Sequence, residues 1–404
     1  MRFFSRKYIF SYLYKLLCKK QIAASYSLSW EQRKAIDIAD YSKGNGYSKG
    51  DLTDAGTPII LYGRLYTKYQ FAISEVDTFA VSRNGAVYSQ GNEVIVPASG
   101  ETADDIARAS AVEKSGVLLG GDLNILRPFD FINPLFLALA ISNGEPQKEL
   151  AKKAQGKSVV HIHNTDIQEV TIAYPSRTEQ DRIVSVFRQL DNLITLHQRK
   201  YDKLTNVKKS MLEKMFPKNG SNVPEIRFKG FTEAWEQRKF EEIAVRSSVI
   251  CSDANLPRVE YEDIVSGAGR LNKDIYAKQS SKSGIAFHRG DVLYGKLRPY
   301  LQNWLLPTFD GLAVGDFWVL QPQNADSSFL YRLIQSRQFD EVANQSTGTK
   351  MPRADWKLVS KTVFSIPSNI SEQAAIGTYF TALDNLITLH QRKWKRINFA
   401  VHTD

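Results

Sequence analysis

A stretch of 22 residues occurs twice in this chain of 404 residues. Residues 179–200 read EQDRIVSVFRQLDNLITLHQRK and residues 372–393 read EQAAIGTYFTALDNLITLHQRK, so 15 of 22 positions are identical. A shorter pair precedes them in the same order, WEQRKAIDIA at residues 30–39 and WEQRKFEEIA at residues 235–244. Such self-similarity predicts two copies of one structural unit, joined end to end. Because the copies agree at their edges and differ in their middles, we expect one frame that holds two different recognition domains.

Length, charge and cysteine content narrow the class of protein. With 43% hydrophobic residues, 404 residues are enough for two domains that each bury a core. The formal net charge of +10 favours a polyanionic partner, either nucleic acid or an acidic membrane face, although the same charge also serves solubility alone. Cys18 and Cys251 are the only cysteines, which excludes a disulfide framework and a thiolate metal cluster. We therefore expect a cytoplasmic protein.

The first 29 residues imitate a secretory signal, with a basic start, an apolar stretch and a small-residue end. Lys15 interrupts the apolar stretch, and Lys19 and Lys20 follow it closely. These lysines are unsuited to a signal core and to a membrane span, so we expect neither. Residues 1–29 are interpreted as an atypical N-terminal segment.

The long repeats carry the pattern of a helical seam, because their apolar residues are spaced alternately by four and three. We expect one helix from Glu179 to about Phe216, where Pro217 ends it, and a second in the other copy. The two seams predict a coiled coil, and the alternative is that each helix packs only on its own domain. His197 and His390 are expected to set the register, not to bind a ligand. The predicted seam comprises Ile183, Phe187, Leu190, Ile194 and His197, and then Ile376, Phe380, Leu383, Ile387 and His390.

The two stretches ahead of the long helices mix strand-like and helical patterns, which predicts an α+β fold class. Each ends in a strand-like run and a Pro-Ser pair, Pro175-Ser176 or Pro367-Ser368. Strand-like runs occupy residues 116–126, 158–163, 170–175, 290–297, 317–322 and 362–367, and helical patterns occupy residues 133–142 and 327–345. The predicted organisation is a first domain at residues 30–176, a central helix and linker at 177–234, a second domain at 235–368 and a C-terminal helix at 369–404.

Three short motifs suggest catalysis or ligand binding, but their context does not support it. Residues 151–158, AKKAQGKS, approach a phosphate loop, yet polar helix-like residues precede them where a buried strand is required. Residues 133–136, NPLF, differ at one position from the base-gripping loop of amino-group methyltransferases, and no cofactor loop precedes them, so we interpret them as a capped helix start. His161 and His163 share a strand face, but no cysteine or carboxylate cluster accompanies them. The sequence gives no positive indication of a catalytic site.

Polar, glycine-flanked and basic stretches occur at comparable places in the two domains. Loops that combine arginine, lysine, hydroxyl and amide side chains with aromatic residues have the groups needed to position phosphates and to read base edges. Each such stretch could equally be a solvated loop. The candidate DNA-binding residues are Arg83, Asn84, Ser99 and Lys157 in the first domain, and Lys282, Lys296, Arg298, Tyr300, Thr349 and Lys350 in the second.

Taken in order, these motifs resemble the specificity subunit of type I restriction-modification systems. The resemblance rests on the two EQ…LDNLITLHQRK segments, on PEIRFKGFTEAWEQRK at residues 224–239, on GDVLYGKLRPYLQN at 290–303 and on GTKMP at 348–352. It covers the chain from Trp30 onward. One departure is clear: the first copy has CKKQIAASYSLS ahead of WEQRK, where the second has VPEIRFKGFTEA.

The resemblance implies a fold and a set of partners. It implies two target-recognition domains separated by two long conserved helices that pack as an antiparallel coiled coil, with a pseudo-two-fold internal repeat. Two modification subunits would bring S-adenosylmethionine and methyl transfer, and restriction subunits would bring ATP, Mg and DNA cutting. This chain would hold no cofactor and no metal, would not contact a membrane and would read an asymmetric, bipartite site in double-stranded DNA.

Two other classes of protein remain as alternatives. One is a methyltransferase fused to its own recognition domains, which the missing cofactor loop argues against. The other is an interaction protein whose coiled coil dimerises and whose basic charge is incidental. Weak binding to DNA that ignores its sequence would favour this last class.

Overall fold

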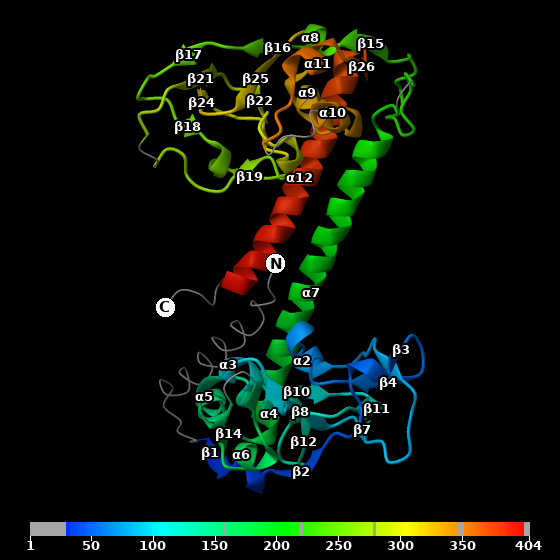
Figure 1. The fold of residues 1–404 in the computed structure, drawn as a ribbon, viewed down its shortest axis with the longest axis vertical. Helices are drawn as coiled ribbons and strands as arrows, with labels where there is room; N and C mark the ends of the chain where they lie inside the picture. Colours follow the sequence, from blue (N-terminus) through cyan, green and yellow to red (C-terminus); the bar gives the residue numbers. More distant parts are fainter. Residues whose placement is uncertain (1–29, 157–158, 219–220, 278–279, 346–350, 400–404) are drawn as a thin grey trace. The chain divides into compact units, whose positions relative to one another are not determined.

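The computed structural model describes residues 30–399 apart from 157–158, 219–220, 278–279 and 346–350 (Figure 1). The chain divides into two compact units. Unit 1 extends to His197 and includes the residues from Arg392, and unit 2 is Gln198–Gln391. Both units mix strands and helices, which confirms the predicted mixed class of fold.

Unit 1 contains two five-stranded sheets. In the first, most neighbours are antiparallel, and β10 pairs in parallel with the edge strand β5. In order, its strands are β2 (Ala39–Lys43), β12 (Leu123–Pro128), β8 (Glu93–Pro97), β10 (Ser110–Val112) and β5 (Ala72–Ile73). The second sheet comprises β3 (Leu52–Thr53), β6 (Phe79–Ala80), β4 (Thr57–Ile60), β11 (Ser115–Leu119) and β7 (Tyr88–Gln90). Two short pairs complete the unit, β1 (Glu31–Lys34) with β14 (Thr171–Tyr174) and β9 (Ser99–Gly100) with β13 (Val160–His161).

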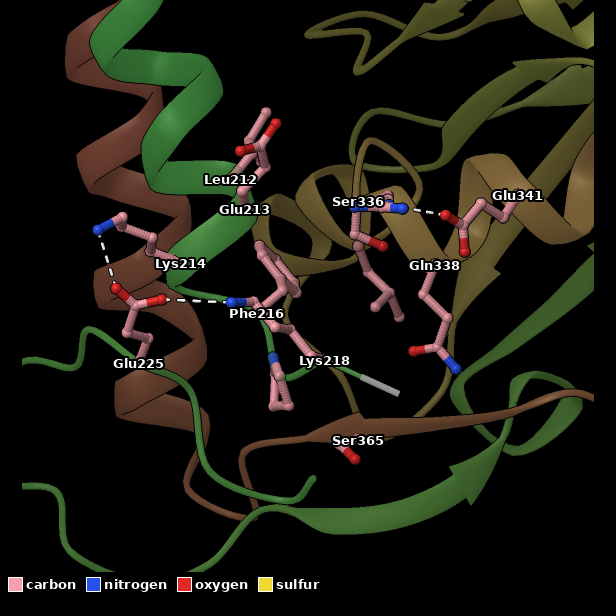
Figure 2. Close-up of a pocket in the computed structure, with 13 residues that line it drawn as sticks. Leu212, Glu213, Lys214, Phe216, Lys218, Glu225, Ser336, Gln338, Glu341 and Ser365 are labelled. Carbon is pink, nitrogen blue, oxygen red and sulfur yellow. Dashed lines mark hydrogen bonds and ion pairs between the residues drawn. The ribbon is translucent and has the colours of Figure 1, made fainter. Parts of the chain in front are cut away.

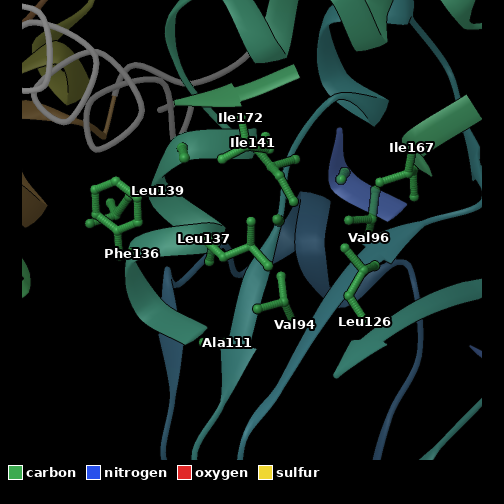
Figure 3. Packing of buried hydrophobic residues seen from close by; sticks show 14 of the residues in the cluster. Val94, Val96, Ala111, Leu126, Phe136, Leu137, Leu139, Ile141, Ile167 and Ile172 are labelled. Atoms are coloured by element: carbon green, nitrogen blue, oxygen red, sulfur yellow. The ribbon is translucent and has the colours of Figure 1, made fainter. Parts of the chain in front are cut away.

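The helix α4 (Pro134–Ile141) lies in the core of unit 1. It is apolar on every side, so it is buried all round. Figure 3 shows its side chains among those of β8 and β12. Asn133 begins the helix, since its side-chain oxygen accepts from the backbone N–H groups of Leu135 (2.9 Å) and Phe136 (3.3 Å). The prediction that NPLF starts a helix is therefore confirmed. The other helices of the unit are α2 (Arg64–Thr67), α3 (Ala103–Ile106), α5 (Gly144–Lys153), α6 (Asn164–Gln168) and the first part of α7 (Arg177–Lys214).

A buried glutamine fixes the start of α7 to unit 1. The Gln180 side chain is fully buried and accepts from the backbone N–H of Asn133 at 2.8 Å. It also donates to the carbonyl oxygens of Phe131 (3.0 Å) and Pro175 (2.9 Å). Ile183 and Phe187 enter the same core as α4. These predicted seam residues thus pack against their own domain.

Unit 2 contains two four-stranded sheets. The first runs β16 (Ala244–Ser247), β25 (Phe317–Pro322), β22 (Val292–Gly295) and β23 (Trp304–Leu305). The second runs β17 (Ile250–Cys251), β21 (Gly284–Phe287), β24 (Gly311–Ala313) and β18 (Arg258–Val259). Two pairs complete the strands, β15 (Glu236–Lys239) with β26 (Val363–Ile366) and β19 (Ile264–Val265) with β20 (Arg270–Leu271). The helices are α8 (Phe240–Ile243), α9 (Ser327–Leu333), α10 (Arg337–Ala343), α11 (Trp356–Lys361), α12 (Ile370–Phe399) and the last part of α7.

The start of α12 repeats the arrangement found at the start of α7. Gln373 is buried, accepts from the backbone N–H of Asp326 at 2.8 Å and donates to the carbonyl oxygen of Pro367 at 2.8 Å. Asp326 caps α9, as Asn133 caps α4 in unit 1. The repeated EQ pair therefore has a local structural role, because its glutamine joins each long helix to a capped helix of the domain.

Within unit 2, the end of α7 packs beside α12. Apolar residues of α7, such as Leu204 and Met211, lie against the core that contains Ile376, Phe380 and Leu383 of α12. Polar contacts accompany this packing: the carboxylate of Asp384 binds the Lys208 ammonium at 2.7 Å and the Arg332 guanidinium at 2.7 Å. The α12 seam residues thus serve helix–helix and helix–domain packing at once. Leu190, His197, Ile387 and His390 are only partly buried, whereas Ile194 is 2% exposed.

The two long helices and the strands at 170–175, 290–297, 317–322 and 362–367 are confirmed, but three predicted elements are wrong in extent. Residues 116–126 form two strands, because the chain turns at Asp122 with a φ of 56°. Residues 327–345 form two helices, because Ser336 takes an extended conformation and caps α10. In 158–163 the described strand is only β13, and His163 begins α6.

Candidate nucleic-acid interface

The loop between β22 and β23 carries three of the candidate residues in unit 2, Lys296, Arg298 and Tyr300. Its tip is a 3-10 turn, Pro299–Leu301, flanked by Arg298 and Gln302 in the left-handed backbone region (φ 48° and 56°). Pro299 is buried beneath the tip. Arg298 is exposed, and Tyr300 and Leu301 are 56% and 37% exposed. The loop therefore presents a cation and an aromatic ring at its outermost point.

A cluster of charges lies behind this tip. Lys296 and Arg353 share the carboxylate of Asp316, at 3.5 Å and 3.1 Å. Partial burial alone would raise the pKa of Asp316, but the hydrogen bonds and charges of Arg353 and Lys296 outweigh it, so that pKa is lowered. Lys296 and Arg353 therefore bring two cations close to the tip. Such an arrangement suits contact with a phosphate backbone.

Lys282 occupies a different edge of unit 2. Its side chain is 64% exposed, and its ammonium lies 3.2 Å from the Glu260 carboxylate. Its backbone carbonyl accepts from Arg258 Nε at 2.8 Å, which fixes the local chain. Glu260 compensates the charge of Lys282, so this residue is a weaker candidate than Lys296.

In unit 1 the candidate loop is the turn at residues 82–86. The Arg83 guanidinium packs over the ring of Tyr47, 5.0 Å from its centroid, and forms an ion pair with Asp51. Asn84 is exposed at the turn, and Gly85 takes a φ of 81° there. The contacts of Arg83 with Tyr47 and Asp51 thus hold the turn that exposes Asn84, and the Arg83 guanidinium itself is engaged within unit 1.

The contacts of Asp51 give a pH-dependent prediction. The Ser48 backbone N–H, then Arg83 and the Ser48 hydroxyl, lower the pKa of Asp51 to about 2. Because this pKa lies below the ordinary value of 3.8, the contacts stabilise the folded loop above about pH 4 and are lost as the pH falls from 3.8 to about 2. We expect Arg83→Gln to raise the Asp51 pKa measured by carboxyl NMR titration. Arg33→Gln, whose partner is Glu31, is the control, and an unchanged Asp51 pKa in Arg83→Gln would contradict the assignment.

The remaining candidates are less accessible or lie outside the described residues. Ser99 is 7% exposed on β9, and its hydroxyl lies 3.1 Å from His161 Nδ1, so it is not presented to a ligand. Lys157, Thr349 and Lys350 lie outside the described residues. Asp316 and Arg353 were not among the predicted site residues. Their signal was weak, because Arg353 pairs with Leu297 only through the fold.

A cavity of about 440 Å³ in unit 2 lies where α7 ends, beside α10 (Figure 2). Its apolar lining includes Leu212, Phe216 and Leu333. Its charged rim is internally paired: Lys214 and Lys218 contact Glu225 at 2.8 and 3.5 Å, and Arg337 contacts Glu341 at 2.7 Å. A cavity with balanced charges does not fit a polyanion, so we do not assign it to nucleic acid.

The part of the chain that the structure describes has neither a metal-binding cluster nor a membrane-spanning helix. Among those residues, no group of three or more histidine, cysteine, aspartate or glutamate side chains is placed to hold a metal ion. None of the helices seen there is both long and apolar enough to cross a bilayer.

Two α+β units, each joined to a long helix, define the architectural class of this protein. A sequence model of the family described as the type I restriction modification DNA specificity domain matches residues 28–206. The EcoDI specificity subunit of Escherichia coli is 22% identical over 245 residues, which are 53% of this chain and 55% of that protein. The MjaVIII specificity subunit of Methanocaldococcus jannaschii is 21% identical over 351 residues, 80% of this chain and 79% of that protein. The chain thus spans about half the length of the first relative.

Solved structures agree with these sequence matches. The S subunit of a type I restriction-modification system from M. genitalium superposes with a TM-score of 0.60 at 14% identity, covering 94% of this chain and 96% of that one. A chain from a structural study of the assembly and conformational transition of the type I R-M system gives a TM-score of 0.51 at 13% identity, covering 94% and 97%. At these identities the structures establish the fold.

Residues 28–206 therefore match the DNA specificity domain of type I restriction-modification systems. The family predicted from the repeated motifs is therefore confirmed. Both sequence relatives are named as specificity subunits and not as methyltransferases.

Proposed function

We propose that this chain is the DNA-recognition subunit of a type I restriction-modification complex and reads a bipartite site, one half with each unit. The observation that carries this proposal is that both units have the same junction with a long helix but different exposed loops. The EQ junction is the same in both units, through Gln180 and Gln373, whereas the loops differ, with Asn84 in unit 1 and Arg298 with Tyr300 in unit 2. Different loops on equivalent supports would read different base sequences.

The long helices would space the two readers. The packing of Leu204 and Met211 beside Ile376 and Phe380 supports an antiparallel coiled coil between α7 and α12, as the resemblance implies. The repeated sequence supports a pseudo-two-fold frame. A rigid spacer of this kind favours an unread gap between the half-sites.

The partners follow from the same proposal. Two modification subunits, with S-adenosylmethionine, would methylate the site, and restriction subunits, with ATP and Mg, would translocate and cut DNA. This chain would place them on double-stranded DNA in the cytoplasm. The duplicated exposed helix surfaces at Leu193 and Leu386 are consistent with two copies of one partner.

The test is to sequence the methylated sites in a host that carries this chain and its partner subunits. We expect one bipartite motif that disappears when the chain is deleted. Arg298→Ala should relax or change one half of the motif, because a good base contact discriminates by about 1–3 kcal/mol. Asn84→Ala is the matched variant in unit 1 and should alter only the other half. A motif that is unchanged in the deletion strain, with active partners, would contradict the proposal.

The two alternative classes predict different results. A self-contained methyltransferase would modify DNA as a purified chain without partner subunits. An interaction protein would leave every methylated motif in place when deleted. Either outcome is distinct from the loss of one motif.

A further inference from the structure

The tip of the loop between β22 and β23 has a fixed shape. The Arg298 N–H donates to the Pro352 carbonyl oxygen at 2.7 Å, and the Gln302 carbonyl oxygen accepts from the Gly267 N–H at 3.0 Å. Both Arg298 and Gln302 have positive φ values, which non-glycine residues adopt only where the surrounding structure enforces them. Strained residues of this kind concentrate at functional sites. The tip is therefore shaped before any partner arrives.

The tip offers side chains and few backbone donors. The N–H groups of Leu301 and Gln302 donate within the turn, to the carbonyl oxygens of Arg298 (2.8 Å) and Pro299 (2.9 Å). Pro299 has no N–H and is buried. A phosphate-binding loop would aim backbone amides outward. This one instead raises an aromatic ring, 56% exposed, beside a leucine that is 37% exposed.

The surroundings of this apolar tip are cationic. Lys296 and Arg353 both contact the carboxylate of Asp316 near the tip, and Arg298 is exposed at its edge. Cations around an apolar tip are what a protein needs to hold a phosphate backbone while an apolar side chain enters the base stack.

We propose that Tyr300, supported by Leu301, is a wedge that inserts between two base pairs of the half-site read by unit 2 and unstacks them. This inference rests on the proposed function. A phenol ring has no bidentate donor–acceptor set for base readout but has a flat face on which an unstacked base can lie. Opening a base step costs free energy. A flexible loop would add the entropy cost of becoming ordered on binding, and the fixed tip avoids this additional cost. Arg298 would then hold the phosphates or base edge beside the opened step.

The test uses the full chain in complex with its modification subunits and duplexes that carry 2-aminopurine at successive positions of the site, excluding the methylated adenine. Binding affinity is measured by anisotropy on the same duplexes. We expect a several-fold rise in 2-aminopurine fluorescence at one step of one half-site. Tyr300→Ala should abolish that rise and weaken binding about tenfold, whereas Tyr300→Phe should keep both. Tyr276→Ala, at another exposed tyrosine of unit 2 (68% exposed), is the matched control and should behave as the wild type.

The outcomes separate this inference from the function on which it rests. Specific binding without a fluorescent step, or a step that survives Tyr300→Ala, overturns the wedge and leaves DNA recognition standing. Failure of the wild-type complex to prefer its own site overturns both. If Tyr300→Ala releases a modification subunit and leaves the fluorescent step intact, the tip is a protein contact and the wedge is wrong.

Discussion

Arg227→Met should destabilise unit 2 by about 3–5 kcal/mol, because it leaves a buried carboxylate without its counter-charge. Glu372, in the first turn of α12, is 1% exposed and receives two hydrogen bonds from the Arg227 guanidinium, at 2.7 and 2.8 Å. The Trp235 indole N–H adds a third at 3.2 Å. The hydrogen bond to Glu372 is also the main reason that the pKa of Arg227 is raised. One ion pair thus joins the linker, the start of β15 and α12.

Denaturant unfolding followed by tryptophan fluorescence measures this effect, since Trp235, Trp304, Trp318 and Trp356 all lie in unit 2. The matched control is Arg238→Met, whose partner Glu236 is 43% exposed, so we expect a change of about 0–1 kcal/mol. The double variant Arg227→Met with Glu372→Gln should recover part of the loss, because no buried charge remains. A loss in Arg227→Met as small as in Arg238→Met would show that the pair does not hold the junction.

The frame could be predicted from sequence because its signals are local. The heptad spacing in residues 179–216 and the Asn133-Pro134 start each depend on neighbours a few residues apart, and the structure has α7 and α4 at those places. The departure ahead of Trp30 was also visible. The stretch VPEIRFKGFTEA of the second copy contains Arg227, and the importance of this residue became clear only from its contact with Glu372, 145 residues away.

The candidate interface was less predictable because it depends on contacts between distant residues. Lys296 was singled out, but Asp316 and Arg353 reach it only through β25 and the bridge from Leu297 to Arg353. Ser99 lies in a polar, glycine-flanked stretch like the other candidates. It is nevertheless buried, because β9 pairs with β13. Periodicity cannot reveal such pairings, since short irregular strands take their exposure from tertiary contacts.

The heptad seam predicted contact between the two long helices, whereas in the structure the seam residues also contact the domains. Ile183 and Phe187 enter the core of unit 1 with α4, and Ile376 and Phe380 enter the core of unit 2 with α9. A heptad pattern specifies which face of a helix is buried but not what covers it. In unit 2, α7 therefore packs beside α12, while both long helices also pack on their own domains.

Leu386→Asp with Leu389→Asp should remove one modification subunit from the complex. Leu386 and Leu389 lie three residues apart on α12 and are 43% and 44% exposed. The other copy of the repeat has Leu193 and Leu196 on α7, 44% and 45% exposed. Single exposed leucines are common, but the same exposed pair on two identical helix segments indicates one kind of partner bound twice.

Native mass spectrometry of the assembled complex gives the readout. If two modification subunits dock on these two leucine pairs, the α12 double variant should retain one subunit, the corresponding α7 double variant should also retain one, and the combined variant should retain none. Replacing a buried apolar anchor by a carboxylate weakens binding by on the order of 2–4 kcal/mol, which is about 30- to 1000-fold in affinity. Asn385→Ser, at the exposed position directly before Leu386, is the control and should keep both subunits. Two subunits bound to the combined variant would place the docking surface elsewhere and leave these leucines without a role in assembly.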